Sequence, residues 1–319
     1  MSVLAGIDEA GLGPILGPLV ISSSTFSIPH NLLEANLWQI LRRSVGNKRK
    51  ALAGRLLVAD SKKAYHRSDG IGHLERTVLA CLNCLGSKPS NLIELLEILC
   101  PDSIERLSNY PWHKDIASHN LAVNEADIGI ASSVLKDNLN SNGIELLELR
   151  SCCLDVAYYN KMVGAVKNKA SVLFTAVCGL IKSAWDNHPA DELQILVDRQ
   201  GGRMMYRTPL QQMFPEMELK ILKETDTNSS YELTAGGRKM RVHFAVGADD
   251  RFLPVSLASM ASKYLRELLV EGLNRYFVGQ CAALKPTAGY WKDGLRFIED
   301  LKKYVPHIQY DDNQMIRCR

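Results

Sequence analysis

Residues 6–18 read Gly-Ile-Asp-Glu-Ala-Gly-Leu-Gly-Pro-Ile-Leu-Gly-Pro, and two adjacent acids, Asp8 and Glu9, end an apolar run there before a glycine-rich loop. The residues on either side, 3–7 and 16–21, have the apolar character of two buried strands. A hairpin with an acidic turn is the alternative, but such a turn favours Gly or Asn over an Asp-Glu pair. Acids at the end of a rigid strand suit divalent metal, so the stretch predicts a metal-binding strand end.

This stretch resembles the first signature of the type 2 ribonucleases H, the ribonuclease HII family. The matching residues are Gly6, Asp8, Glu9, Gly11, Gly13, Pro14 and Gly17. Where this chain has Leu12, the family has arginine. Further matches follow in the family's order: Asp-Ser-Lys-Lys at 60–63, Asn168, Ile-Leu-Val-Asp at 195–198, the Ser-rich stretch 247–267 and Gly-Tyr at 289–290.

The order of strand-like and helix-like segments favours an α/β protein. The resemblance implies the ribonuclease H-like fold, a five-stranded mixed sheet flanked by helices, with a helical insertion and a helical C-terminal extension. It also implies a discontinuous catalytic domain over 1–87 and 144–278, with the insertion at 88–143 and the extension at 279–319 packed on the catalytic domain. The stretch 199–246 is longer than the family pattern, and we expect it to add a binding edge.

Apolar periodicity predicts helices and strands along the chain. The predicted helices cover 32–43, 71–85, 91–99, 122–139, 160–185, 253–277 and 291–304. Besides the strand pair within 1–28, strands are predicted within 143–157, 194–198, 217–223 and 231–246, the last interrupted by a turn at 235–237.

Composition sets outer limits on function. The chain has 319 residues, 46% of them hydrophobic, and a net charge of +3, which alone does not indicate a nucleic-acid partner. A basic cluster within 42–55 either contacts nucleic acid or is a solvated surface. No apolar stretch approaches the roughly 18 residues of a membrane span, and the N-terminus lacks the features of a signal peptide. We therefore expect a cytoplasmic protein with no membrane partner that acts as a monomer.

The eight cysteines lie mostly in apolar contexts, which predicts reduced, buried thiols. Cys81 and Cys84 have the spacing of a zinc or redox pair. They lie in an amphipathic helix pattern without a second pair at zinc-finger spacing, so core packing is the favoured interpretation.

Four acids are the expected catalytic residues and metal ligands: Asp8, Glu9, Asp198 and Asp249. Each alone has another explanation, since Asp198 could cap the following loop and Asp249 or Asp250 could cap a helix. The family spacing favours Asp249 over Asp250 as the fourth acid. Clustered carboxylates have raised pKa values unless cations neutralise them, and oxygen ligands select Mg²⁺ or Mn²⁺. Two such ions can hold a scissile phosphate, with Asp8 bridging them, Glu9 and Asp198 each on one, and Asp249 on the second ion or the water.

Substrate contacts are expected from Gly11, Leu12, Gly13, Lys62, Lys63, Ser259, Lys263 and Tyr290. The lysines suit phosphates, although Lys62 and Lys63 could also form a solvated turn and Ser259 could be a small packing residue. The resemblance implies that Tyr290 stacks on the sugar beside an RNA–DNA junction, where a 2′-hydroxyl distinguishes RNA from DNA. Leu12 lacks the guanidinium of the family's loop, which puts junction recognition in doubt.

The leading hypothesis is a metal-dependent endonuclease that cuts the RNA strand of RNA–DNA hybrids and leaves 5′-phosphate and 3′-hydroxyl ends. The first alternative is a nuclease of the same fold with another nucleic-acid substrate, such as branched DNA or structured RNA. The second is a non-catalytic nucleic-acid-binding relative, although a pure binder gains nothing from four acids facing a polyanion.

Overall fold

A seven-stranded mixed sheet forms the centre of the protein. The structure is a computed structural model that describes residues 1–65, 70–121, 124–190 and 192–318. The strand order is β5-β2-β1-β6-β9-β8-β7. In chain order the strands are β1 (Ser2–Ala10), β2 (Leu19–Ile28), β5 (Glu145–Leu154), β6 (Glu192–Asp198), β7 (Glu218–Glu224), β8 (Asn228–Ala235) and β9 (Arg238–Ala245). The two short strands β3 (Val45–Gly46) and β4 (Leu56–Leu57) pair separately.

The parallel centre of the sheet brings the acidic strand ends to one edge. β1 pairs in parallel with β6, with Ile7 opposite Val197, and β6 pairs in parallel with β9, with Asp198 opposite Ala245. The carboxyl ends of parallel strands meet at the same edge, so the ends of β1, β6 and β9 lie together. The predicted antiparallel pair at the N-terminus is confirmed, since β2 runs against β1 from Ser2–Ile28 to Ala10–Val20.

The ribonuclease H-like arrangement is confirmed by β5-β2-β1-β6-β9, and the sheet is two strands wider than the five expected. The extra strands β8 and β7 continue from β9 through antiparallel pairs. The hairpin between β8 and β9 turns at Gly236 and Gly237, both with positive φ. Tyr231 and Leu233 of β8 are fully buried, whereas six of the seven residues of β7 are exposed, so β7 is the solvated edge.

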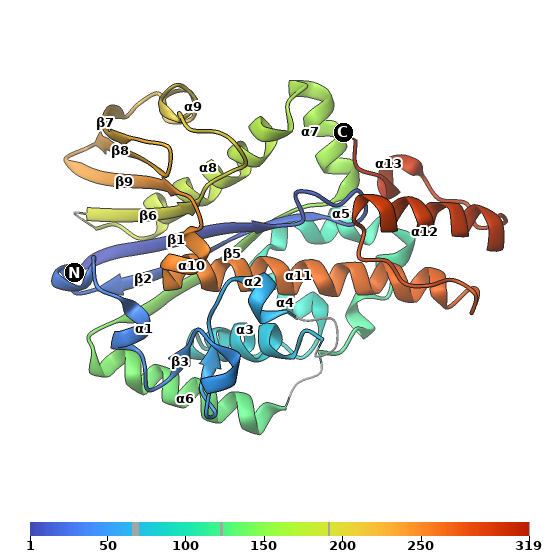
Figure 1. Ribbon diagram of the computed structural model, residues 1–319, viewed down its shortest axis with the longest axis horizontal. Helices are drawn as coiled ribbons and strands as arrows, with labels where there is room; N and C mark the ends of the chain where they lie inside the picture. Colours follow the sequence, from blue (N-terminus) through green and yellow to red (C-terminus); the bar gives the residue numbers. More distant parts are fainter. Residues whose placement is uncertain (66–69, 122–123, 191, 319) are drawn as a thin grey trace.

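Helices cover both faces of the sheet (Figure 1). On one face α11 (Leu253–Val278) packs along β1 and β2, with α3 (Gly72–Cys84) and α6 (Glu125–Ser141) beyond it. The other face carries α7 (Val156–Val166), α8 (Lys169–Asn187) and α9 (Arg207–Met213). The approach of α11 to β1 is close at Gly6, where an added Cβ would lie 2.2 Å from the carbonyl carbon of Pro254.

The helices of 88–143 share one hydrophobic cluster with the rest of that face. They are α4 (Leu92–Leu99), α5 (Ile104–Ser108) and α6. Leu95 of α4 and Leu135 of α6 belong to the same buried cluster as Leu79 of α3 and Leu265 of α11. The proposed division into a discontinuous domain, an insertion and an extension stays a prediction.

Two predicted helices differ in the structure. The helix predicted over 32–43 is wrong: the segment holds only a 3-10 turn, His30–Leu32, and the short α1 (Leu37–Ile40). Asn36 interrupts it, because its side chain accepts hydrogen bonds from the amides of Trp38 and Gln39 and so starts a new helix. The helix predicted over 160–185 divides into α7 and α8 at Lys167, which has a left-handed φ of 54°.

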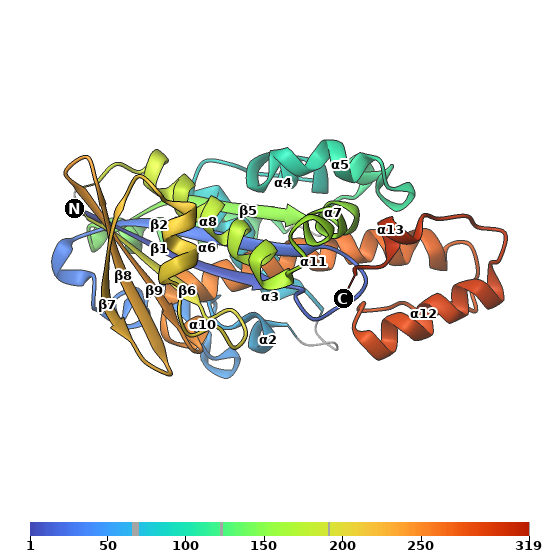
Figure 2. The ribbon, with the colours of Figure 1, turned by 90° about the horizontal axis from the view of Figure 1, so that it is seen from above.

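Most of the other predicted helices are confirmed, with shifts of a few residues. They are α3, α4, α11 and α12 (Trp291–Tyr304); the predicted 122–139 corresponds to α6, and residues 122–123 lie outside the described residues. Figure 2 shows α12 at the end of the molecule opposite β7. After α12 the chain forms α13 (Asp312–Met315) and returns to the loop after β1, where Ile316 bridges Leu16.

Two further expectations concern thiols and membranes. All eight cysteines are free thiols. Four are buried as predicted, Cys81, Cys100, Cys153 and Cys178, whereas Cys84, Cys152 and Cys281 are only partly buried and Cys318 is exposed. Among the described residues no single helix is long and apolar enough to cross a membrane; α7 and α8 pass such a test only as a pair bent by 113°.

Candidate active site

Asp8 and Glu9 lie near the carboxyl end of strand β1 and not in the loop that follows it. Asp8 is buried and Glu9 is half-buried. The Oδ1 atom of Asp8 accepts a hydrogen bond of 2.8 Å from the Glu9 amide. From α11, the Ser262 hydroxyl donates to the Asp8 carbonyl at 3.0 Å, which fixes the strand end against the helix. Both acids therefore stand on rigid backbone.

The other two predicted acids come from the neighbouring strand and the turn after β9. Asp198 ends β6, and its Oδ1 accepts a hydrogen bond of 2.7 Å from the amide of Ala248. That amide begins α10 (Ala248–Arg251), which carries Asp249. Gly247 has a φ of 62°, so a glycine there allows the tight turn from β9 into α10.

The charges of these four acids act on one another, which places them in a single cluster. Burial, followed by the charges of Glu9 and Asp198, raises the pKa of Asp8 well above its usual value. Burial and the charge of Asp198 raise the pKa of Glu9 to about 7. Burial, then the charges of Asp198 and Asp60, raise the pKa of Asp249 to about 7. Without a bound cation, the cluster holds protons near neutral pH.

A fifth acid, Asp60, belongs to this cluster and was not predicted. It is buried, acts on Asp249, and caps α2 (Ser61–Ala64) by accepting a 2.9 Å hydrogen bond from the Lys62 amide. The sequence did contain a signal, because Asp60 ends the apolar run 56–59 just as Asp198 ends its own.

Lys62 is a cation whose charge acts on several of these acids. Burial lowers its pKa, but the charges of Asp60, Asp249 and Asp8 together raise it above its ordinary value. Its charge in turn opposes the rise in the pKa values of Glu9, Asp198 and Asp249 that burial causes. Lys63 lies apart, with its Nζ 2.5 Å from Oδ1 of Asp250.

The structure separates Asp249 from Asp250. Asp249 is buried among the cluster, whereas the side chain of Asp250 is about half exposed and pairs with Lys63. Asp249 therefore remains the proposed fourth acid.

The donor set suits a hard divalent cation. Carboxylate oxygens that repel one another in a buried site are stabilised by positive charge, and oxygen ligands favour Mg²⁺ or Mn²⁺. As the side chains lie, no three His, Cys, Asp or Glu residues in the described ranges form a metal shell. Asp8 and Asp198 each direct one oxygen, Oδ1, to a backbone amide, which leaves the second oxygen of each carboxylate for a cation.

The loop after β1 presents backbone to solvent. Leu12 is 38% exposed and Gly13 is exposed, with nothing within 4 Å of the position of an added Cβ. Gly11, in contrast, has a φ of 98° and lies so close to Arg266 that a Cβ would be 2.6 Å from its Nε. The Gly289 carbonyl accepts a 2.8 Å hydrogen bond from the Ile15 amide, which places the exposed Tyr290 next to this loop.

Ser259 and Lys263 lie on α11, but neither presents a free polar group. Ser259 is 1% exposed and donates a 3.1 Å hydrogen bond to the Ser61 hydroxyl. Lys263 forms an ion pair of 2.7 Å with Glu267 and lies over the Tyr65 ring. Both residues brace the elements that carry the acids.

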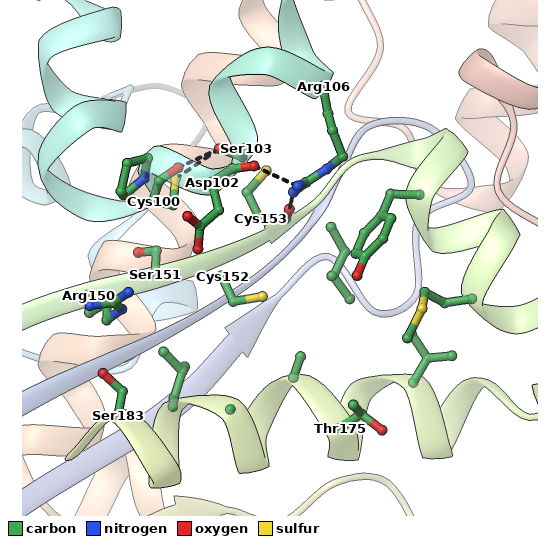
Figure 3. A pocket seen from close by; sticks show the side chains of 18 residues that line it. Cys100, Asp102, Ser103, Arg106, Arg150, Ser151, Cys152, Cys153, Thr175 and Ser183 are labelled. Atoms are coloured by element: carbon green, nitrogen blue, oxygen red, sulfur yellow. Dashed lines mark hydrogen bonds between the residues drawn. The ribbon is translucent and has the colours of Figure 1, made fainter. Parts of the chain in front are cut away.

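A separate pocket of about 300 Å³ lies beside β5, between the start of α5 and the face of α8. Its polar lining includes Cys100, Arg106, Cys152 and Cys153 (Figure 3). Arg106 is already paired with Asp155 at 2.7 Å. None of the proposed site residues lines this pocket.

Comparison with known proteins gives a likeness in structure only. No family model matches the chain, and no curated protein matches it. The chain is similar in structure to RNase HII from Archaeoglobus fulgidus, solved in complex with PCNA, at 16% identity and a TM-score of 0.47 over 99% of this chain and 94% of that one.

Two other solved structures are similar over comparable lengths. Ribonuclease H2 from Pyrococcus horikoshii OT3 is 15% identical, with a TM-score of 0.43 over 98% of this chain and 92% of that one. RNase H3 from Aquifex aeolicus is 14% identical, with a TM-score of 0.42 over 98% of this chain and 71% of that one. The functional proposal rests on this chain's own residues.

Proposed function

We propose that the protein is a divalent-metal-dependent endonuclease that hydrolyses the RNA strand of RNA–DNA hybrids. The observation that carries the proposal is the cluster of five acids, Asp8, Glu9, Asp60, Asp198 and Asp249, gathered from two strand ends, the cap of α2 and the short helix α10. A structural role does not explain it, because burying mutually repelling carboxylates costs free energy. Strongly shifted pKa values produced by burial and specific charges are typical of functional sites.

The acids would divide two tasks between them. Asp8, Glu9 and Asp198 would hold the ions, and Asp249 would hold an ion or the attacking water. When bound, such ions supply Lewis-acid stabilisation of the phosphate and activation of water. Lys62 offsets part of the cluster's negative charge, and its ammonium group is suited to bind a phosphate of the substrate.

A polyanionic substrate is supported by the basic segment before α2. The stretch 35–59 contains no acid, and its exposed cations are Arg42, Arg43, Lys48 and Lys50. Arg49 joins this stretch to α2, since its Nη2 donates a 2.5 Å hydrogen bond to the Ala64 carbonyl. Positive charge next to the acid cluster suits the phosphates of a nucleic acid, which pass beside the cleavage site.

Recognition of RNA is assigned to the loop after β1 and to Tyr290. An exposed tyrosine beside a glycine-rich loop is suited to stack on a sugar and to bond a 2′-hydroxyl. Leu12 gives that loop no charged donor, so recognition there depends on backbone groups. We therefore expect slower cleavage at a single ribonucleotide within DNA than on a long hybrid.

A second candidate is a nuclease of the same fold that acts on branched DNA or structured RNA. Leu12 favours it, and so do the extra strands β7 and β8, which widen the sheet beside β9. A non-catalytic binding role is disfavoured, because a cluster of acids repels the phosphates that a binder has to hold.

Cleavage of matched 5′-labelled duplexes tests the proposal. The set comprises a long RNA–DNA hybrid, a DNA duplex with one ribonucleotide, all-DNA and a four-way DNA junction, each with Mg²⁺, Mn²⁺ or chelator. Metal-dependent cutting of the hybrid, with 5′-phosphate products, supports the proposal. Cutting of the junction alone would favour the second candidate, and tight binding of the hybrid without any cutting would favour the non-catalytic role.

A further inference from the structure

We propose that Arg317, carried by the C-terminal segment 316–318, is a positioning residue that fixes the loop 11–16 with the Leu12 amide turned towards the substrate side. The proposal concerns the loop's conformation in the free protein, and its consequence for catalysis rests on the proposed function. It assigns to segment 316–318 a role in positioning the loop that follows β1.

The C-terminal segment is built into the loop by backbone contacts. Ile316 forms an antiparallel bridge with Leu16, and the Arg317 amide donates a 2.8 Å hydrogen bond to the Ile15 carbonyl. Asn160 of α7 holds the segment from the other side. Its amide donates to the Ile316 carbonyl at 2.8 Å, and its Oδ1 accepts from the Cys318 amide at 2.7 Å.

The Arg317 side chain then lies beneath the loop. It is 3% exposed, and its Nη2 donates to the carbonyls of both Gly11 and Pro14. A trans peptide is planar with its C=O and N–H opposed, so a Gly11 carbonyl directed at Arg317 turns the Leu12 N–H away from it. Since Leu12 and Gly13 are the exposed residues of the loop, that N–H faces the outer side.

Arg266 supports the same loop from α11. Its Nη2 donates to the carbonyls of Leu16 at 3.3 Å and Ala288 at 3.1 Å. Burial, and then the charge of Arg266, lower the pKa of Arg317 to about 10, so two buried cations repel each other under the loop. Within the described residues, none of the ion pairs involves Arg317.

Burying both guanidinium groups costs free energy, and a role in fixing the loop carbonyls explains why they are buried there. The Nε of Arg266 and the Nε and Nη1 of Arg317 are buried and have no hydrogen-bond partner among the described residues. A neutral side chain would avoid the cost of burying a second cation. The guanidinium can fasten two carbonyls at once and also supplies positive charge beneath a loop whose exposed side chain, Leu12, has none.

The test compares Arg317→Gln and Arg317→Lys with Lys302→Gln, which removes one exposed cation from α12. Hydrogen exchange of the amides of residues 11–16 is measured in the free protein. Thermal unfolding and steady-state kinetics on the long hybrid are measured alongside. For Arg317→Gln we expect at least about tenfold faster exchange in this loop, because a charged hydrogen-bond donor is lost. We also expect a KM raised by about tenfold with kcat changed by less than about threefold.

Arg317→Lys should recover part of both effects, and Lys302→Gln should leave both unchanged. Unchanged exchange in residues 11–16, or faster exchange spread evenly over the whole protein, would overturn the positioning role. If Arg317→Gln does not fold, Arg317→Lys decides through the same exchange measurement. If the unaltered protein neither binds nor cuts the hybrid, the proposed function fails, while hydrogen exchange still decides the role of Arg317.

Discussion

Leu12 is the residue at which this chain departs most clearly from a loop built to contact nucleic acid. Its side chain is exposed and apolar, between two glycines. An exposed leucine offers no hydrogen bond to a phosphate or a 2′-hydroxyl, so the loop contributes only through its backbone. The cluster of acids does not depend on this side chain, which separates metal chemistry from junction recognition.

Leu12→Arg should therefore improve cleavage at a single ribonucleotide. A guanidinium at this exposed position can donate charge-assisted hydrogen bonds, so kcat/KM for the single-ribonucleotide duplex should rise by about tenfold. The value for a long hybrid should change less. The measurement is a comparison of kcat/KM on the two duplexes, with Leu12→Gln as a neutral polar control. Equal gains with Gln and Arg would show that charge at this position is not what is missing.

The four acids named from the sequence do lie together, and Asp60 joins them. The signature around Asp8 and the apolar strand before Asp198 are local patterns, so they could be found without coordinates. Asp60 was not predicted, because the apolar run 56–59 before it is short and the following lysines are equally typical of a solvated turn. Which of Asp249 and Asp250 faces the cluster depends on the turn at Gly247, which no local pattern specifies.

At the level of elements, the contact between β1 and α11 holds the site together. Gly6 lies two residues before Asp8, and the backbone of Pro254 and Val255 approaches it directly. Ser24 of β2 reinforces the contact, since its hydroxyl donates a 2.7 Å hydrogen bond to the Pro254 carbonyl. A side chain at position 6 would push the helix from the strand that carries two of the acids.

Gly6→Ala should destabilise the protein by about 3 kcal/mol, because the added methyl group meets backbone atoms that cannot rotate away. Gly129→Ala is the matched control: this glycine lies in α6 and has nothing within 4 Å of an added Cβ. That change should stabilise the protein by up to about 1 kcal/mol. Urea unfolding of both variants gives the comparison, and equal stabilities would contradict the close approach of α11.

The helix α12 could be predicted from sequence because its amphipathic pattern is repeated over many residues. The segment 32–43 has a similar pattern, but Asn36 interrupts it through side-chain hydrogen bonds that periodicity does not reveal. The strands of 217–246 were expected, whereas their place in the sheet was not. Strand order depends on pairing with β9, a contact that the local sequence does not encode.

At the scale of the whole molecule, folding gathers negative charge from positions between 8 and 249 of the chain into one buried cluster. Glu9 and Asp249 have pKa values of about 7 in the folded protein, above their ordinary values of 4.5 and 3.8. At pH values between the ordinary and the raised pKa values, the metal-free folded state therefore binds more protons than the unfolded chain. The free energy of unfolding should fall as pH rises through this window and level off above it.

Thermal unfolding with and without Mn²⁺ tests this coupling. Divalent ions compete with protons for the acids, so Mn²⁺ should raise Tm more at about pH 8 than at about pH 5. Glu9→Gln should weaken both the pH dependence and the Mn²⁺ effect. Glu299→Gln removes an exposed acid from α12 and should change neither. An equal rise in Tm with Mn²⁺ at both pH values would contradict the claim that the metal-free folded state binds extra protons at these acids.

The central claim, that the acid cluster performs metal-dependent cleavage, is tested most directly by Asp8→Asn. Single-turnover cleavage of a labelled RNA–DNA hybrid and its Kd are measured for the unaltered protein, Asp8→Asn and Asp250→Asn. We predict that Asp8→Asn lowers the cleavage rate by about 100-fold or more with Kd changed by less than about threefold, while Asp250→Asn cleaves at nearly the original rate. Asp8→Asn cleaving as fast as the unaltered protein, or Asp250→Asn alone losing activity, would contradict the account.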